Sequence, residues 1–83
     1  MKNSQVARFW YSNYPAKSKN GNYKTDGSNL FSYALKIGTT DSSGRKILYN
    51  YTKSGGKHMS RTTTSHVNLA KFYADELVDF NEL

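Results

Sequence analysis

The sequence predicts an α+β domain, in which an antiparallel sheet of three or four strands carries one C-terminal helix on a face. Apolar residues alternate with a period of two in the middle of the chain, which is typical of strands. Near the end of the chain they recur at three- and four-residue steps, which is typical of a helix. The 83 residues suffice for a single domain, residues 1–83, with a small core.

The first element is predicted to be a strand near residues 5–12, where Val6, Arg8 and Trp10 would share one face. Pro15 would end it, because proline cannot donate to a ladder. Residues 15–29 are polar and carry Asn-Gly and Asp-Gly turn signals, so we expect a long basic loop there.

The alternation in residues 30–37 predicts a strand whose odd-numbered side chains are buried. These side chains are Phe31, Tyr33, Leu35 and Ile37. Residues 39–45 form a turn in this interpretation, and the next strand covers residues 46–52 with Ile47, Tyr49 and Tyr51 on one face. A glycine pair then predicts a hairpin turn at 53–57, followed by a short strand at 58–62.

The helix is predicted over residues 65–80. Its apolar face consists of Val67, Ala70, Ala74 and Leu77, widened by Tyr73 and Phe80. We expect this face to pack against the odd-numbered side chains of the 30–37 strand.

The stretch SRTTTSHV, residues 60–67, lies where the last strand should give way to the helix. One interpretation is structural, with Thr63 or Thr64 capping the first backbone N–H groups. The other is an anion site, in which Arg61 and His66 add charge and a donor to the helix start. The sequence favours the structural interpretation, since hydroxyl residues are common at helix starts.

Charge is divided unevenly along the chain. Residues 1–74 hold all twelve Lys and Arg against Asp26 and Asp41, a net charge of +10, whereas residues 75–83 carry four acids and no base. A basic body attracts phosphate or acidic protein surfaces, although it also serves solubility.

Several classes of function are not favoured by the composition. There is no cysteine, so disulfides and thiolate metal sites are excluded, and a reducing cytoplasm would suit the chain. No apolar run approaches the roughly 20 residues of a membrane span, and the first ten residues do not resemble a signal peptide. Two histidines without a ligand spacing predict no metal, and no acid–base pair or phosphate loop is identifiable. We therefore expect no enzyme, cofactor or membrane partner.

The blocks TDGSNLFSYALKIG, GRKILYNYT and TTTSHVNLA resemble a loose group of small uncharacterised bacteriophage proteins. Those proteins share a DG..L.SY...I strand and a TT..H start to a C-terminal helix. The TT..H pattern corresponds to Thr62, Thr63 and His66, with Thr64 as an additional threonine. The resemblance covers about residues 25–72 and implies a phage origin, a host-cytoplasm location and a role in host takeover or anti-defence.

The sequence predicts a small, basic, non-enzymatic binding protein, and two partner classes compete. One is nucleic acid, held by cations and rings on one surface. The other is an acidic host protein, such as an enzyme or defence factor that the chain would inhibit. The candidate binding residues are Lys17, Lys19, Lys24, Arg45, Lys46, Arg61, His66, Trp10 and Tyr23. The oligomeric state is not predicted.

Overall fold

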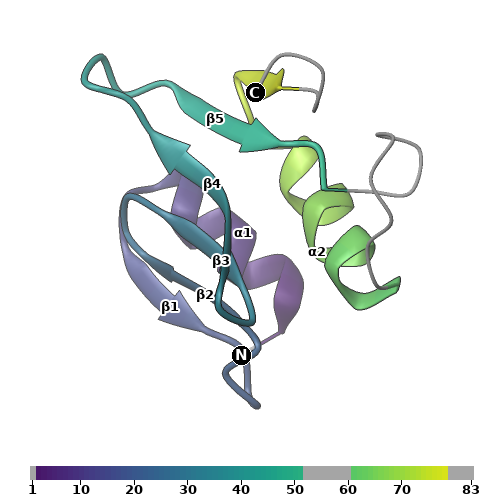
Figure 1. Ribbon diagram of the computed structural model, residues 1–83. Helices are drawn as coiled ribbons and strands as arrows, with labels where there is room; N and C mark the ends of the chain where they lie inside the picture. The colour runs from purple at the N-terminus through teal and green to yellow at the C-terminus, as the bar shows by residue number, and fades with distance from the viewer. Residues whose placement is uncertain (1, 52–60, 79–83) are drawn as a thin grey trace.

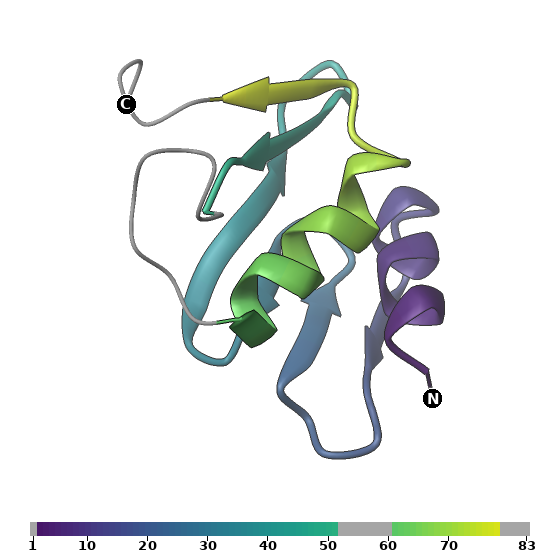
Figure 2. The same ribbon diagram turned by 90° about the vertical axis from the view of Figure 1, so that its right-hand side faces the viewer.

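The computed structural model describes residues 2–51 and 61–78, which form a curved six-stranded sheet with two helices against one face (Figures 1 and 2). The helices are α1 (Asn3–Tyr11) and α2 (Arg61–Lys71). The strands are β1 (Pro15–Lys17), β2 (Tyr23–Asp26), β3 (Leu30–Ser32), β4 (Leu35–Thr40), β5 (Lys46–Tyr49) and β6 (Glu76–Val78).

The strands lie in chain order across the sheet, and the first five are antiparallel to their neighbours. The last strand, β6, pairs in parallel with β5 after the chain has passed through α2. The predicted α+β class is confirmed. The predicted sheet of three or four antiparallel strands with one helix is wrong, because the sheet is mixed and a second helix covers it.

Helix α1 replaces the strand expected near residues 5–12. Val6, Ala7 and Trp10 are buried, and their spacing of one and four residues places them on one helical face. The Lys2 backbone N–H donates to Gln5 Oε1 at 2.9 Å and helps to start the helix. Asn13 ends it in the left-handed region, with φ 66°. The apolar pattern of residues 5–12 is too short to distinguish the period of two of a strand from the period of 3.6 of a helix.

The prediction of a long loop at 15–29 is wrong, because this segment contains the antiparallel hairpin of β1 and β2. Its turn is closed by the Gly21 N–H, which donates to the Ser18 carbonyl at 3.0 Å. The next turn is built on Asp26, whose Oδ1 accepts from the N–H groups of Ser28 and Asn29 at 2.9 and 2.7 Å. The predicted turns are confirmed, but the strands between them are too short and polar to show in the pattern.

The single strand expected at 30–37 is two strands, β3 and β4, because the chain turns sharply at Tyr33. Tyr33 has φ 58°, a conformation that few bulky residues adopt, and its side chain is 47 % exposed. Leu30 and Ser32 are buried in its place, and Phe31 is only half-buried. The predicted buried face is therefore wrong for Phe31 and Tyr33, and right for Ile37.

Strand β5 buries its even-numbered side chains, including Leu48, while Ile47 and Tyr49 are half-buried on the other face. The turn predicted at 39–45 is confirmed for residues 41–45 by the Gly44 N–H, which donates to the Asp41 carbonyl, whereas Thr39 and Thr40 belong to β4. The hairpin turn expected at 53–57 and most of the 58–62 strand lie outside the described residues. Arg61 and Thr62, the last two residues of that expected strand, are helical.

Helix α2 begins and ends earlier than the expected helix at 65–80. Beyond Lys71 the chain turns into the sheet, because the Asp75 N–H donates to the Lys46 carbonyl and Asp75 Oδ2 accepts from the Lys46 N–H, both at 2.8 Å. Leu77 consequently pairs with Leu48 on β5 instead of lying on a helix. Val67 and Ala70 are buried as expected.

The apolar core of the described residues lies between the helices and the sheet. It consists of Val6, Ala7, Trp10, Tyr23, Leu30, Ile37, Leu48, Val67 and Ala70. Trp10 is central, since its Nε1 donates to the Ser28 carbonyl at 3.0 Å and its ring covers Gly38. Both helices therefore pack on one face and leave the other face of the sheet uncovered by helix (Figures 1 and 2).

Candidate functional site

A row of side chains crosses the uncovered face of the sheet. Lys17 pairs with Lys24, Lys24 with Phe31, and Phe31 with Lys36. Directly opposed residues project to the same face of a sheet. The residues that alternate with them, such as Tyr23 and Ser32, are buried toward the helices, so the row faces away from the core. We call Lys17, Lys24, Phe31 and Lys36 the lysine row.

The lysine row is both accessible and cationic. Its three lysines are exposed and Phe31 is half-buried among them. Three inter-strand steps of about 4.8 Å give the row a length of about 14 Å. Within residues 2–51 and 61–78 the structure shows one ion pair, between Arg45 and Glu76. None of the ammonium groups of the lysine row therefore pairs with a carboxylate in this part of the chain.

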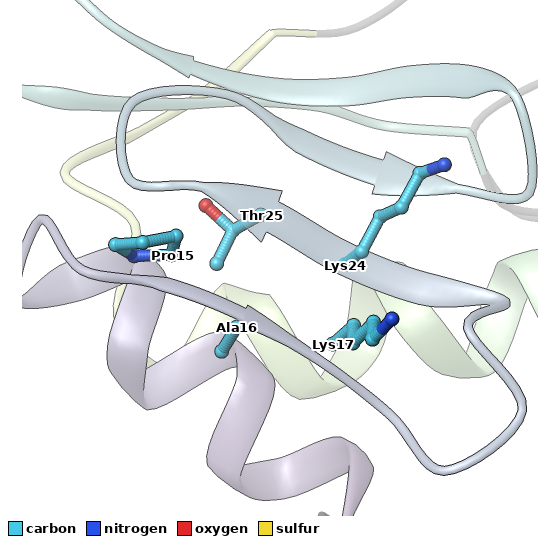
Figure 3. Close-up of a pocket in the computed structure, with 5 residues that line it drawn as sticks. All are labelled: Pro15, Ala16, Lys17, Lys24 and Thr25. Carbon is cyan, nitrogen blue, oxygen red and sulfur yellow. The ribbon is translucent and has the colours of Figure 1, made fainter.

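Figure 3 shows one end of the row, where Lys17 and Lys24 extend from neighbouring strands. A shallow, open depression of about 350 Å³ lies here, lined by Pro15, Ala16, Lys17, Lys24 and Thr25. Lys19 is exposed in the turn that joins β1 to β2. The structure thus brings Lys17, Lys19 and Lys24, three of the residues predicted from sequence, to one end of the sheet.

Four other predicted binding residues lie in the interior. Trp10 and Tyr23 are fully buried, and Lys46 and His66 are each 2 % exposed. Their side chains are engaged within the protein, so they are not on a surface that a partner would contact in this structure.

Lys46 is a buried cation held by neutral oxygens. Its Nζ donates to Asn13 Oδ1 and to Thr40 Oγ1, both at 2.6 Å, and lies 5.5 Å from the centre of the Trp10 ring. Burial lowers the pKa of Lys46, while the nearby Asp75 carboxylate acts in the opposite direction. The ammonium group therefore joins α1 to the end of the sheet.

His66 belongs to a buried polar cluster with Tyr23, Ser32 and Thr63. Ser32 Oγ lies 2.7 Å from His66 Nδ1 and 3.2 Å from Thr63 Oγ1, and the Tyr23 hydroxyl donates to the His66 carbonyl at 2.9 Å. Burial lowers the pKa of His66, which favours the neutral imidazole. A Ser–His pair is a familiar nucleophile and base, but the Ser32 side chain is fully buried and out of reach of a substrate in this conformation.

The two interpretations of SRTTTSHV are both changed by this placement. Because α2 begins at Arg61, Thr63 and Thr64 lie inside the first turns, and the prediction that one of them is the N-cap is wrong. Arg61 is exposed while His66 is turned into the core, so the predicted pair of anion-binding side chains is not assembled on one surface. Arg45 lies apart from the lysine row, 4.0 Å from Glu76.

Sequence reasoning missed Phe31 and Lys36 as site residues. Lys36 could have been found, since a lysine that alternates with Leu35 and Ile37 should face water. Its position beside Phe31 depends on the turn at Tyr33 and on the register of β3 and β4, which the alternation does not reveal.

Comparisons with protein-family models, with curated proteins and with solved structures find no match to this chain. The resemblance to small phage proteins therefore stays a prediction. Across residues 2–51 and 61–78 there is no group of three His, Cys, Asp or Glu side chains that could hold a metal ion. None of the helices in this part of the chain has the length and apolar character needed to cross a bilayer.

Proposed function

We propose that the protein binds nucleic acid on the uncovered face of its sheet, and that it does so without catalysing a reaction. The observation that carries this proposal is the lysine row, in which an aromatic ring lies between cations on neighbouring strands. The resemblance to small bacteriophage proteins supports placing this activity in the cytoplasm of an infected host.

The chemistry of the row suits a nucleic-acid strand. Lysine ammonium groups attract phosphates and release their counterions, which supplies affinity without regard to sequence. An aromatic side chain in the same groove provides a surface on which a base can stack. Phe31 has Lys24 on one side and Lys36 on the other, so a strand that crosses the sheet would meet phosphate and base contacts within about 14 Å.

The surrounding charge supports the same proposal. Lys19 extends the basic surface beyond the end of the row, and the whole chain has a formal net charge of +6. Asp26, the acid nearest to Lys24 along β2, has its carboxylate occupied by the backbone N–H groups of Ser28 and Asn29. These hydrogen bonds lower the pKa of Asp26, so its carboxylate stays ionised on the same face as Lys24, but they hold it in its own turn without an ion pair to the lysine row.

The test is the fluorescence anisotropy of a labelled oligonucleotide, single-stranded or duplex, titrated with protein at several salt concentrations. The wild-type affinity should fall as salt rises, with a log–log slope of about −0.7 per phosphate contacted on a single strand and about −0.9 on duplex DNA. Replacing Lys24 and Lys36 with Ala should flatten the single-strand slope by about 1.4, since two phosphate contacts are lost.

A matched control is the double replacement of Arg8 and Lys71 with Ala, which removes the same charge from the helices. That variant should keep the wild-type slope to within about half a unit, because its charges are remote from the row. If both double variants lower affinity equally, the attraction is one of net charge, and the lysine row is not the site. If the wild type binds neither single strand nor duplex at about 50 mM salt, the proposal is wrong.

A further inference from the structure

A second surface lies where the C-terminal ends of α1 and α2 meet, away from the lysine row (Figures 1 and 2). Three aromatic side chains gather there, Tyr11, Phe72 and Tyr73, and the exposed Leu69 lies on α2, three residues before Phe72. We call these four residues the helix-end patch. The Tyr11 and Tyr73 rings are 5.6 Å apart and the Phe72 and Tyr73 rings 5.1 Å apart, so the three rings form a continuous surface.

The helix-end patch exposes more apolar surface than the fold requires. Phe72 is 86 % exposed, Tyr11 53 % and Leu69 37 %, whereas Tyr73 packs partly against the core. An exposed phenylalanine forgoes most of the roughly 1.5–3 kcal/mol that its burial would contribute. Adjacent exposed rings of this kind are typical of interaction sites and provide large contact area with little loss of side-chain freedom.

Two cations lie near the patch along the chain, one on each helix. Arg8 lies three residues before Tyr11 on α1, and Lys71 directly precedes Phe72 at the end of α2. Both are exposed, and neither forms an ion pair with another described residue. They suit the negative ends of the helix dipoles and bring positive charge to the helix ends that carry the patch. The nearest carboxylate along the chain, that of Asp75, accepts a hydrogen bond from the Lys46 N–H.

The charge and size of the patch indicate what it can bind. A two-fold contact between copies would bring the same cations together, because residues near the axis of such a dimer meet their own equivalents. Four side chains are also too few for the roughly 800 Å² that each partner contributes to a stable dimer. A different molecule that offers apolar side chains and carboxylates would satisfy both the rings and the cations.

We propose that the helix-end patch docks a short acidic and apolar segment of a partner protein. Phe72 and Tyr11 are the anchors, and Arg8 and Lys71 pair with carboxylates on the segment. This site goes beyond the nucleic-acid site, since it uses none of the residues of the lysine row. It gives the acidic-protein partner class a defined surface.

The probe is a fluorescein-labelled amphipathic peptide of about 14 residues made of Leu, Phe, Asp and Glu. The comparison peptide carries Asn and Gln in place of the acids. The wild type should bind the acidic peptide at least about tenfold more tightly than the amide peptide. Phe72→Ser should weaken binding of the acidic peptide about tenfold or more, and the double variant Arg8→Gln with Lys71→Gln should abolish the preference for acids.

Two controls separate this proposal from folding and from nucleic-acid binding. Phe72→Ser should keep the wild-type melting temperature to within a few degrees, because the ring lies largely in water. The Lys24→Ala and Lys36→Ala double variant should bind the peptide as the wild type does, even if it loses nucleic acid. If the lysine row proves not to bind nucleic acid, the test of peptide binding at the helix-end patch is therefore unaffected.

Four outcomes would overturn the proposal. Equal binding of the acidic peptide by the wild type and Phe72→Ser would remove the patch as the site. Equal binding of the acidic and amide peptides would remove the role of the cations. Sedimentation of the wild type as a dimer that Phe72→Ser dissociates would make a second copy the occupant. A gain of affinity on deletion of residues 79–83 would make the chain's own acidic end the occupant.

Discussion

The imidazole of His66 lies flat against the ring of Tyr23, with ring centroids 4.2 Å apart and planes only 7° from parallel. The hydroxyl of the same tyrosine donates to the His66 backbone carbonyl at 2.9 Å. Tyr23 thus contacts both the ring and the backbone of a residue 43 positions later, and it fixes α2 on β2. Several measurable properties follow from this and from neighbouring contacts.

The stability of the protein should depend on the charge of His66. Burial lowers the folded-state pKa of His66 below the value of about 6.5 in the unfolded chain, so the unfolded state binds the proton more readily. Stability should be fully present above about pH 6.5 and should decline as pH falls toward the lowered folded-state pKa. Urea unfolding between about pH 7.5 and 5 measures this slope.

His66→Gln should remove most of this pH dependence, since glutamine can hydrogen-bond to Ser32 without titrating. His58→Gln, which changes the other histidine of the chain, serves as the matched control and should keep the slope. A slope that survives in the His66 variant and vanishes in the His58 variant would contradict the assignment.

Ser32→Ala should destabilise the protein by about 1–3 kcal/mol, because it leaves His66 Nδ1 without its hydrogen-bond partner inside the core. Ser42→Ala, on an exposed turn, should change the free energy of unfolding by less than about 0.5 kcal/mol. Chemical denaturation of both variants compares them directly. Equal free energies of unfolding for the two variants would mean that His66 Nδ1 finds another hydrogen-bond partner when Ser32 is replaced.

Gly38→Ala should cost about 1–3 kcal/mol through overpacking. A Cβ at this position would stand 2.9 Å from Cζ2 of Trp10, and the tryptophan is held in place by its own hydrogen bond to Ser28. Gly44→Asn is the comparison for backbone strain, since that turn position has no atom within 4 Å but a φ of 88°, which strains any side chain and asparagine less than most. A melting temperature of Gly38→Ala equal to that of the wild type would show that the Trp10 contact is misplaced.

Leu48→Ala should cost about 2–5 kcal/mol, because the side chain is fully buried between the sheet and the helices. Leu35→Ala should cost less than Leu48→Ala, since Leu35 is only partly buried at the edge of the core. The alternation in residues 30–37 predicts Leu35 as a buried core residue. The ranking of the two variants in urea decides between that pattern and the observed register.

Lys46→Met should leave nucleic-acid affinity within about twofold of the wild type, because its ammonium group is turned inward onto Asn13 and Thr40. Lys24→Met removes the same charge from the lysine row and should weaken binding and flatten the salt dependence by about 0.7 for a single strand. The anisotropy titration measures both. A larger loss in Lys46→Met would place the binding surface elsewhere.

Local rules of sequence determined part of this structure. The turns at Asn20-Gly21, Asp26-Gly27 and residues 41–45 follow from glycine and Asx chemistry, which acts over a few residues and needs no distant partner. The apolar spacing of Val67 and Ala70 likewise identified the core face of α2. The exposure of Lys17 and Lys24 on β1 and β2 could be predicted from residue type, because lysine is rarely buried.

The identity of α1, the division of the 30–37 strand and the change from α2 to β6 were decided by tertiary contacts. Val6 and Trp10 share a face in either period over so short a stretch, and the helix is selected because it buries Ala7 with them against the sheet, where Trp10 covers Gly38. Tyr33 takes its unusual φ because the turn places Leu30 and Ser32 in the core.

At the candidate site, too, some properties follow from the sequence alone and others depend on the folded structure. The sequence determined an abundance of lysine and tyrosine and a basic body, since these depend only on composition. Only the folded structure decided that Tyr23, Lys46 and His66 are interior and that Phe31 stands between Lys24 and Lys36. The physical reason is that a side chain's face is set by strand register, and register is fixed by the burial of residues distant in the chain.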